Sequence, residues 1–313
     1  LTTISSCASS RRMDKNKTKY IIGMIVAMLI WGVAWTSGKA AVEHSNAQIS
    51  SFWRYAISLI GMLPVIWYLK EPLKTDKIGL IYMTISGILT ATFSYLFFAG
   101  LSHGDAGYGG TMVTSLVPLI TYILSIIIFK TVVNKRQIIA LCIGFLGAVI
   151  LLNIPINGLD FLNVNSSYFL GAAFVWSLVT ILTQKVANRV KPMFYTLVVF
   201  FVTGLVNMFF ALPYHPFEIT NFDFVFWINI LFVGLLSGTF ATAIFFISAS
   251  KIGAHNTGIF MFIVPIGAII SSIFAYNEQI EFSTIIGCCL SFLSVVLFNF
   301  NGLKKKKNSN NLN

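Results

Sequence analysis

Ten apolar segments divide this chain, and each is about as long as a helix must be to cross a membrane. A helix of roughly 20 residues, rising about 1.5 Å per residue, spans a hydrocarbon core of about 30 Å. Short connections separate the segments, so sequence neighbours are expected to run antiparallel. We predict an all-α polytopic membrane protein with ten transmembrane helices, at Tyr20–Gly38, Ser50–Leu69, Ile78–Ala99, Gly107–Phe129, Gln137–Ile154, Tyr168–Lys185, Phe194–Leu212, Phe224–Ile247, His255–Tyr276 and Phe282–Phe300.

The distribution of positive charges agrees with ten membrane crossings. With ten crossings, 19 of the 21 Lys and Arg residues fall on one side of the membrane, and the exceptions are Lys39 and Arg54. Cytoplasmic loops of membrane proteins carry an excess of Lys and Arg. We therefore predict a multi-pass protein of the cell (inner, cytoplasmic) membrane with both termini cytoplasmic. Beyond the region of Lys39 and Arg54, the opposite loops contain only acidic charges, at Asp105, Asp160, Glu218, Asp223, Glu278 and Glu281.

Composition excludes the main soluble alternatives. Only 10% of the residues are charged and 57% are apolar, whereas a soluble domain carries roughly 25% charged residues. The net charge of +11 would suit nucleic acid, but the positive-inside rule already accounts for where that charge lies. We therefore expect the lipid bilayer as a partner and no nucleic acid.

The chain resembles itself at a shift of about 145 residues, a separation typical of a duplicated domain. Trp31 matches Trp176, and the stretch Tyr95–Pro118 parallels Ala243–Pro265. Each half holds five predicted spans, so the second half enters the membrane in the opposite sense. Inverted repeats are typical of secondary transporters, which bind substrate near the midplane between the halves. The predicted organisation is a cytoplasmic tail at 1–19, a first five-helix repeat at 20–154, an external linker at 155–167, a second five-helix repeat at 168–300 and a basic cytoplasmic tail at 301–313.

A set of residues in a fixed order recurs in both halves: Trp31-Gly32, Arg54, Pro118, Gly144 and Gly147, then Pro265, Glu278 and Gly287. In this set the chain resembles the EamA family of the drug/metabolite transporter superfamily over about residues 20 to 300. The resemblance implies ten helices in two inverted five-helix repeats, and movement of small metabolites, often amino acids and frequently outward. One position departs from the family pattern, because Thr131 stands after the fourth span where the family carries Glu.

The first span presents a stripe that could bind a solute. Trp31, Trp35 and Lys39 are spaced four residues apart and so share one helical face. An ammonium group could neutralise a carboxylate, while the two indoles could stack on an apolar body or pair with a cation. In the alternative interpretation, Lys39 reaches the outer surface and pairs with Glu43, and the tryptophans serve packing.

Arg54 begins the second span and breaks the charge asymmetry, which makes it costly in a membrane and suggests function. Its planar fork suits a carboxylate or a phosphate. The alternative is an outer-edge arginine that is tied to Glu43 or to backbone carbonyls. In the sixth span, Trp176, Thr180 and Gln184 form a matching stripe with neutral polar groups, for which helix packing is the alternative.

Two prolines, Pro118 and Pro265, lie inside predicted spans. A proline within a helix removes a hydrogen bond and frees a carbonyl one turn earlier. Such a carbonyl can face substrate or mark a hinge, and the alternative is a static kink.

These features predict a secondary transporter of small metabolites that works by alternating access, moves an amino acid or similar carboxylate-bearing solute, and acts in export. We expect a monomer and no cofactor. The spans contain no central carboxylate and no clustered His, Asp, Glu or Cys, so we expect no metal site. The alternatives are a carrier of nucleotide-linked or cationic compounds, and an enzyme acting on a lipid-linked substrate, for which no catalytic grouping is evident.

Overall fold

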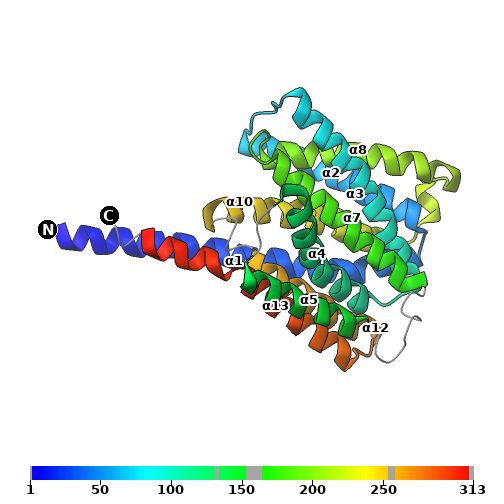
Figure 1. Ribbon diagram of the computed structural model, residues 1–313. Coiled ribbons are helices and arrows are strands. Elements are labelled where there is room, and N and C mark those ends of the chain that lie inside the picture. Colours follow the sequence, from blue (N-terminus) through cyan, green and yellow to red (C-terminus); the bar gives the residue numbers. More distant parts are fainter. Residues whose placement is uncertain (1, 131–133, 153–163, 253–257, 310–313) are drawn as a thin grey trace.

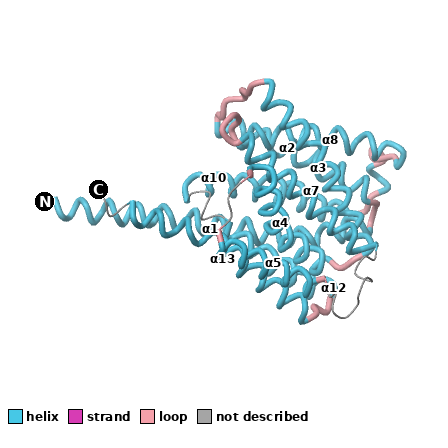
Figure 2. The backbone as a smooth tube through the Cα atoms, viewed as in Figure 1, coloured by secondary structure: helices cyan, strands magenta, loops and turns pink. Residues whose placement is uncertain are grey.

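The structure is a computed structural model that describes residues 2–130, 134–152, 164–252 and 258–309. All regular secondary structure in these residues is helical (Figure 2). The first half contains α1 (Thr2–Glu43), α2 (Ala47–Leu69), α3 (Lys77–His103), α4 (Ala106–Phe129) and α5 (Lys135–Leu151).

The second half begins with α7 (Val164–Val186) and α8 (Pro192–Ala211), followed by the short 3₁₀ turns η2 (Leu212–Tyr214) and η3 (Ile219–Asn221). The next rod consists of three pieces in succession: α9 (Phe224–Leu231), a π-helix η4 (Phe232–Ala241) and α10 (Thr242–Ile252). The chain ends with the 3₁₀ turn η5 (Gly258–Phe262), α12 (Ile263–Tyr276) and α13 (Phe282–Ser309). Apart from Leu152, which caps the end of α5, the described residues of every predicted span lie on these helical elements.

Polar side chains set where four of the helices begin. Asn46, Asp76, Asn134 and Asp223 occupy the N-cap positions of α2, α3, α5 and α9, and each accepts a backbone N–H from the first turn at 2.7 to 3.0 Å. The backbone N–H groups at a helix start lack partners within the helix, so a capping oxygen fixes the first residue. These four apolar segments thus start directly after a capping residue.

Two helices extend beyond the predicted spans into the tails. Residues 2–19 continue directly into α1, and α13 runs on to Ser309. No proline interrupts either stretch, so nothing in the local chemistry ends the helix at the membrane boundary. The predicted linker 155–167 lies mostly outside the described residues, and its last four residues already belong to α7.

Seven helices in the described part of the chain are long and apolar enough to cross a membrane, and two shorter apolar helices lie at 260–276 and 282–297. The protein is therefore a polytopic, all-helical membrane protein. The seven longer segments are Thr18–Glu43, Ala47–Leu69, Lys77–His103, Ala106–Phe129, Ser166–Val186, Pro192–Tyr214 and Phe224–Ala249.

Helices from the two halves pack against one another throughout the bundle (Figure 1). α5 lies along α13, α4 packs on α12, and α2 packs on α8. In addition, α1 contacts α12, while α7 contacts both α3 and α4. Residues near the middle of the bundle therefore belong to both halves, which is where an interfacial site would have to lie.

Charged groups that were predicted to share a side of the membrane meet in the structure. His44 Nδ1, at the end of α1, lies 2.6 Å from Asp223 Oδ2, at the start of α9. At the opposite end, Arg189 pairs with Asp76, and the Met193 N–H donates to Glu71 Oε2 at 3.2 Å. The loops thus group as the charge pattern predicts.

Candidate functional site

Trp35 of α1 and Trp176 of α7, which belong to the related stripes of the two halves, are linked by two phenylalanines of α3. Trp35 of α1 is 5% exposed, and its ring centroid lies 4.7 Å from that of Phe97. Phe97 lies 6.1 Å from Phe93, which in turn lies 4.6 Å from Trp176 of α7. We call these four residues, Trp35, Phe93, Phe97 and Trp176, the aromatic cluster.

Arg54 of α2 lies against the aromatic cluster. Its guanidinium carbon is 4.9 Å from the Phe97 ring centroid and 5.4 Å from that of Tyr55. Its Nη1 atom is buried and has no hydrogen-bond partner in the described residues. The alternative interpretation of Arg54 requires bonds to Glu43 or to backbone carbonyls, and Nη1 forms neither. The structure therefore places a cation with unused donor capacity beside aromatic faces, which attract cations.

Trp31, one turn before Trp35, contacts the second half instead. Its Nε1–H donates to the Ser237 carbonyl at 3.1 Å, and its ring lies 5.3 Å from Phe245. Ser237 belongs to the π-helix η4. π-Helical stretches are rare and occur frequently at functional sites. The first stripe thus divides, with Trp35 in the aromatic cluster and Trp31 on the π-helix.

The π-helix is fastened to the helix that carries Arg54. Ser58 Oγ donates to the Gly234 carbonyl at 2.8 Å, and Thr239 Oγ1 donates to the Ser58 carbonyl at 3.0 Å. A Cβ atom at Gly238 would come within 2.1 Å of Ser58 Oγ. Glycine at this position therefore allows α2 and η4 to approach closely enough for both bonds.

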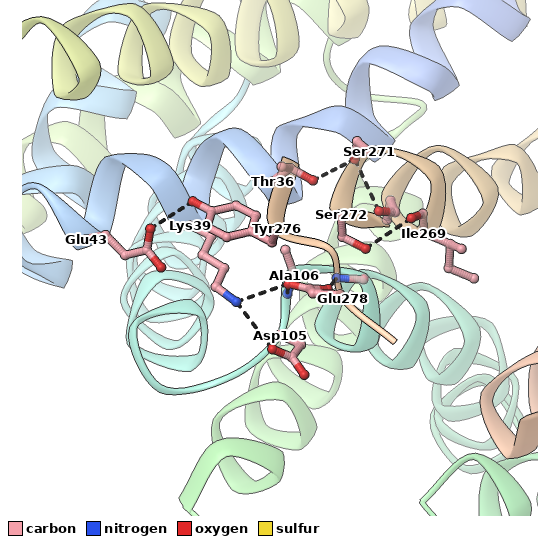
Figure 3. Close-up of polar contacts among 12 residues, drawn as sticks. Thr36, Lys39, Glu43, Asp105, Ala106, Ile269, Ser271, Ser272, Tyr276 and Glu278 are labelled. Carbon is pink, nitrogen blue, oxygen red and sulfur yellow. Dashed lines mark hydrogen bonds and ion pairs between the residues drawn. The ribbon is translucent and has the colours of Figure 1, made fainter. Parts of the chain in front are cut away.

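Lys39, the last member of the first stripe, is engaged in ion pairs (Figure 3). Its Nζ lies 3.0 Å from Glu278 Oε1 and 3.3 Å from Asp105 Oδ1, and 4.6 Å from the Tyr276 ring centroid. The alternative prediction that Lys39 pairs with Glu43 was wrong, because Glu43 accepts a hydrogen bond from the Tyr276 hydroxyl at 2.8 Å instead. We call Lys39, Asp105 and Glu278 the Glu278 cluster.

Glu278 joins three elements in this cluster. Its carboxylate accepts the backbone N–H groups of Ala106 and Gly107, at 2.9 and 2.8 Å, as well as the Lys39 ammonium. Its side chain is only 5% exposed. Burial raises the pKa of Glu278, but the bonds from Gly107, Ala106 and Lys39 outweigh burial and hold this pKa below its usual value. The connection between α12 and α13 is thereby pinned to the start of α4 and to the end of α1.

The second stripe contributes one residue to the aromatic cluster. Trp176 packs on Phe93, whereas Thr180 Oγ1 donates to the Trp176 carbonyl within its own helix at 2.8 Å. Gln184 is exposed. Phe93 and Phe97 thus link Trp35, Arg54 and Trp176, whereas Gln184 lies outside this group.

The two prolines occupy different kinds of position. Pro118 lies in the interior of α4, and the carbonyl of its neighbour Val117 accepts Ser177 Oγ of α7 at 3.2 Å. Pro265 lies in the first turn of α12, where the 3₁₀ turn η5 changes to α-helix. A proline in a first turn costs no helical hydrogen bond. Both prolines thus lie within their predicted spans, Pro265 near the start of α12 and Pro118 inside the continuous helix α4.

Comparisons with known proteins agree with this architecture. The model of the EamA-like transporter family matches the chain twice, over residues 18–153 and 166–300. The uncharacterized transporter YyaM of Bacillus subtilis is 25% identical over 281 residues, covering 85% of this chain and 88% of that protein. An S-adenosylmethionine uptake transporter of Rickettsia prowazekii is 26% identical over 269 residues, covering 83% and 84%.

A solved crystal structure shares the fold. It superposes with a TM-score of 0.59 at 16% sequence identity and covers 89% of this chain and 95% of its own. The two family matches together take in nearly the whole helical bundle, including every residue of the aromatic cluster and of the Glu278 cluster. The chain therefore belongs to the EamA-like transporter family.

Proposed function

We propose that the protein is a secondary transporter of small metabolites whose ten spans form two inverted five-helix repeats that move around a central site. The twofold match to the family model supports the duplication. The separation of basic from acidic loops supports opposite entry of the two halves and cytoplasmic termini. The proposed location is the cytoplasmic membrane.

Helix packing supports the same symmetry. α1 and α7 are the first helices of the two halves, and α4 and α12 are the fourth. The contact of α1 with α12 is therefore equivalent to that of α7 with α4. Likewise, α3 and the rod that contains η4 are the third spans of the two halves, and α2 and α8 are the second. The contact of α3 with α8 is therefore equivalent to that of η4 with α2. Both members of each pair exist in the structure, as expected for repeats that are related by a pseudo-twofold axis.

The single observation that carries the proposed substrate is Arg54 beside the aromatic cluster. A guanidinium group can hold a carboxylate, and aromatic rings can cover an apolar or planar body. We therefore propose an amino acid or similar carboxylate-bearing solute, held by Trp35, Arg54 and Trp176, with export as the direction. Trp31 and Thr180, one turn away from the cluster, are proposed to extend the path of the solute.

A second candidate is a carrier that takes up a nucleoside-linked cationic compound. The relatives named as S-adenosylmethionine uptake transporters favour it. S-Adenosylmethionine combines a carboxylate, a sulfonium cation and a planar adenine, so Arg54 and the aromatic cluster also suit its chemistry. The two candidates differ in the direction of transport and in whether the solute carries a planar base.

Metabolite profiling of cells and medium tests the proposal. Cells that overproduce the wild type would be compared with empty cells and with cells that contain the Lys39→Gln, Arg54→Gln double variant at equal membrane abundance. We expect carboxylated metabolites to accumulate in the medium only with the wild type. Accumulation inside the cells would favour the uptake candidate. Identical profiles in all three strains would contradict both.

A further inference from the structure

We infer that Arg54 binds a single carboxylate of the solute, and that the site accepts one negative charge rather than the two of a phosphate monoester. This inference rests on the proposed function and specifies its central site. It follows from a difference between the two exceptional cations: among the described residues, Lys39 forms ion pairs and Arg54 forms none.

Lys39 is already neutralised within the protein. Its ammonium lies 3.0 Å from one carboxylate and 3.3 Å from another, and the nearer carboxylate, Glu278, is buried and also bound by two backbone N–H groups. A solute anion at Lys39 would have to displace these bonds and would meet two like charges. The Glu278 cluster is therefore a poor site for an anionic solute.

Arg54 has the opposite environment. None of the ion pairs among the described residues includes it, and its Nη1 has neither solvent contact nor a hydrogen-bond acceptor. The groups that flank its guanidinium are the rings of Phe97 and Tyr55. Rings stabilise the charge across their faces, but they leave the in-plane N–H donors unused.

Arg54 as a whole is half-buried, but its Nη1 atom is fully buried. Buried polar groups in proteins are normally paired, and charged groups inside a membrane mark substrate pathways. Arg54 is also fixed in place, because Ser58 and Thr239 fasten the next turn of α2 to η4. A guanidinium with no ion pair among the described residues, on a helix that is fastened to the second half, is thus prepared for a ligand.

The number of charges selects the class of ligand. One guanidinium forms two parallel bonds with a carboxylate, and the pair is neutral. A phosphate monoester carries about two charges near pH 7, so one of them would stay uncompensated next to the apolar rings. With Lys39 engaged elsewhere, the site therefore favours monocarboxylates over phosphorylated compounds of similar size.

Ligand-induced thermal stabilisation of the purified protein in detergent tests this inference. The probes are a panel of free amino acids, their carboxamides, and phosphate monoesters of similar size. For the wild type we expect at least one carboxylate to bind about tenfold or more tightly than its carboxamide and its phosphate counterpart, as the loss of a charge-assisted bond requires. Arg54→Gln should abolish this preference.

Three variants make the result specific. Arg54→Lys keeps the charge without the fork and should retain part of the preference for the carboxylate. Lys39→Gln should keep all of it, and Lys74→Gln, which removes an exposed lysine between α2 and α3, controls for net charge. Each variant must first show one cooperative unfolding transition without ligand. If Arg54→Gln itself unfolds, Arg54→Lys and Lys39→Gln still decide which cation sets the preference.

Several outcomes would overturn the inference. These are full carboxylate preference in Arg54→Gln, loss of that preference in Lys39→Gln, equally tight binding of phosphate monoesters, or no stabilisation of the wild type by any carboxylate. None of these outcomes by itself contradicts a transporter, because profiling would still detect release of a solute without a carboxylate. If the wild type bound carboxylates at Arg54 but changed no metabolite pool, the inference about Arg54 would hold and the proposed transport would be contradicted.

Discussion

Replacing Glu278 with glutamine removes a charge without removing the side chain, and we expect it to destabilise the fold substantially. The carboxylate accepts two backbone N–H groups and the Lys39 ammonium while only 5% exposed. Removing one partner of a buried ion pair costs about 3–5 kcal/mol. Glutamine can still accept one N–H, and Lys39 keeps Asp105. We therefore expect a loss of about 2–4 kcal/mol, since a bond to a charged group contributes about 1.5–3 kcal/mol.

The same variant should alter the dependence of stability on pH. The pKa of Glu278 is lower in the folded protein than its ordinary value, which is about 4.3 in unfolded chains. The stabilisation is therefore fully present above that ordinary value and is lost as the pH falls through the lowered pKa of the folded state. The difference in stability between the wild type and Glu278→Gln isolates the contribution of Glu278. That difference should shrink below about pH 4.3.

Unfolding of the purified protein by a denaturing detergent, followed by tryptophan fluorescence, measures these effects. Glu218→Gln is the matched control, because Glu218 is exposed and its loss should change stability by less than about 0.5 kcal/mol. A double-mutant cycle with Lys39→Met should give a coupling energy of about 0.5–3 kcal/mol. A Glu278→Gln variant as stable as the control, or a coupling energy near zero, would refute the reasoning.

Two further predictions concern packing and topology. Gly238→Ala should cost about 1–3 kcal/mol of unfolding free energy through overpacking against Ser58. Gly204→Ala is the control, because no atom lies within 4 Å of the new Cβ, and it should be neutral or slightly stabilising. Equal effects of the two changes would contradict the close contact of α2 with η4. A cysteine at Glu218 should react with a membrane-impermeant thiol reagent added outside intact cells, and one at Lys191 should react only after the cells are opened; the reverse pattern would contradict the charge-based orientation.

The helices were predictable because their signals are local. Apolar length marks each segment, and a capping residue such as Asn46 or Asp76 fixes its start through a bond three residues away. The π-helix η4 was not predictable in this way. Its wider turns depend on bonds to α2, such as that from Ser58 to Gly234, and those groups are far apart in the sequence.

The candidate site was predictable in its residue types and only partly in its pairings. The repeat matched Trp31 with Trp176 and so related the two stripes that contain Trp35 and Trp176, and the charge pattern identified Lys39 and Arg54 as exceptions. Which cation has a partner depends on which loop reaches it, and Glu278, in a loop more than 200 residues after Lys39, could not be placed there by spacing. The family pattern pointed to Glu278, but only the structure shows that it binds the start of α4.

Counterflow in reconstituted vesicles tests the central claim, transport by alternating access, most directly. Vesicles would be loaded with a high concentration of a carboxylated solute identified by profiling, and a trace of the labelled solute would be added outside. A carrier returns labelled solute inward as unlabelled solute leaves, so we predict a transient accumulation of label above its external concentration. The accumulation should be absent from protein-free vesicles. Label that only equilibrates across vesicles containing the wild type would contradict alternating access.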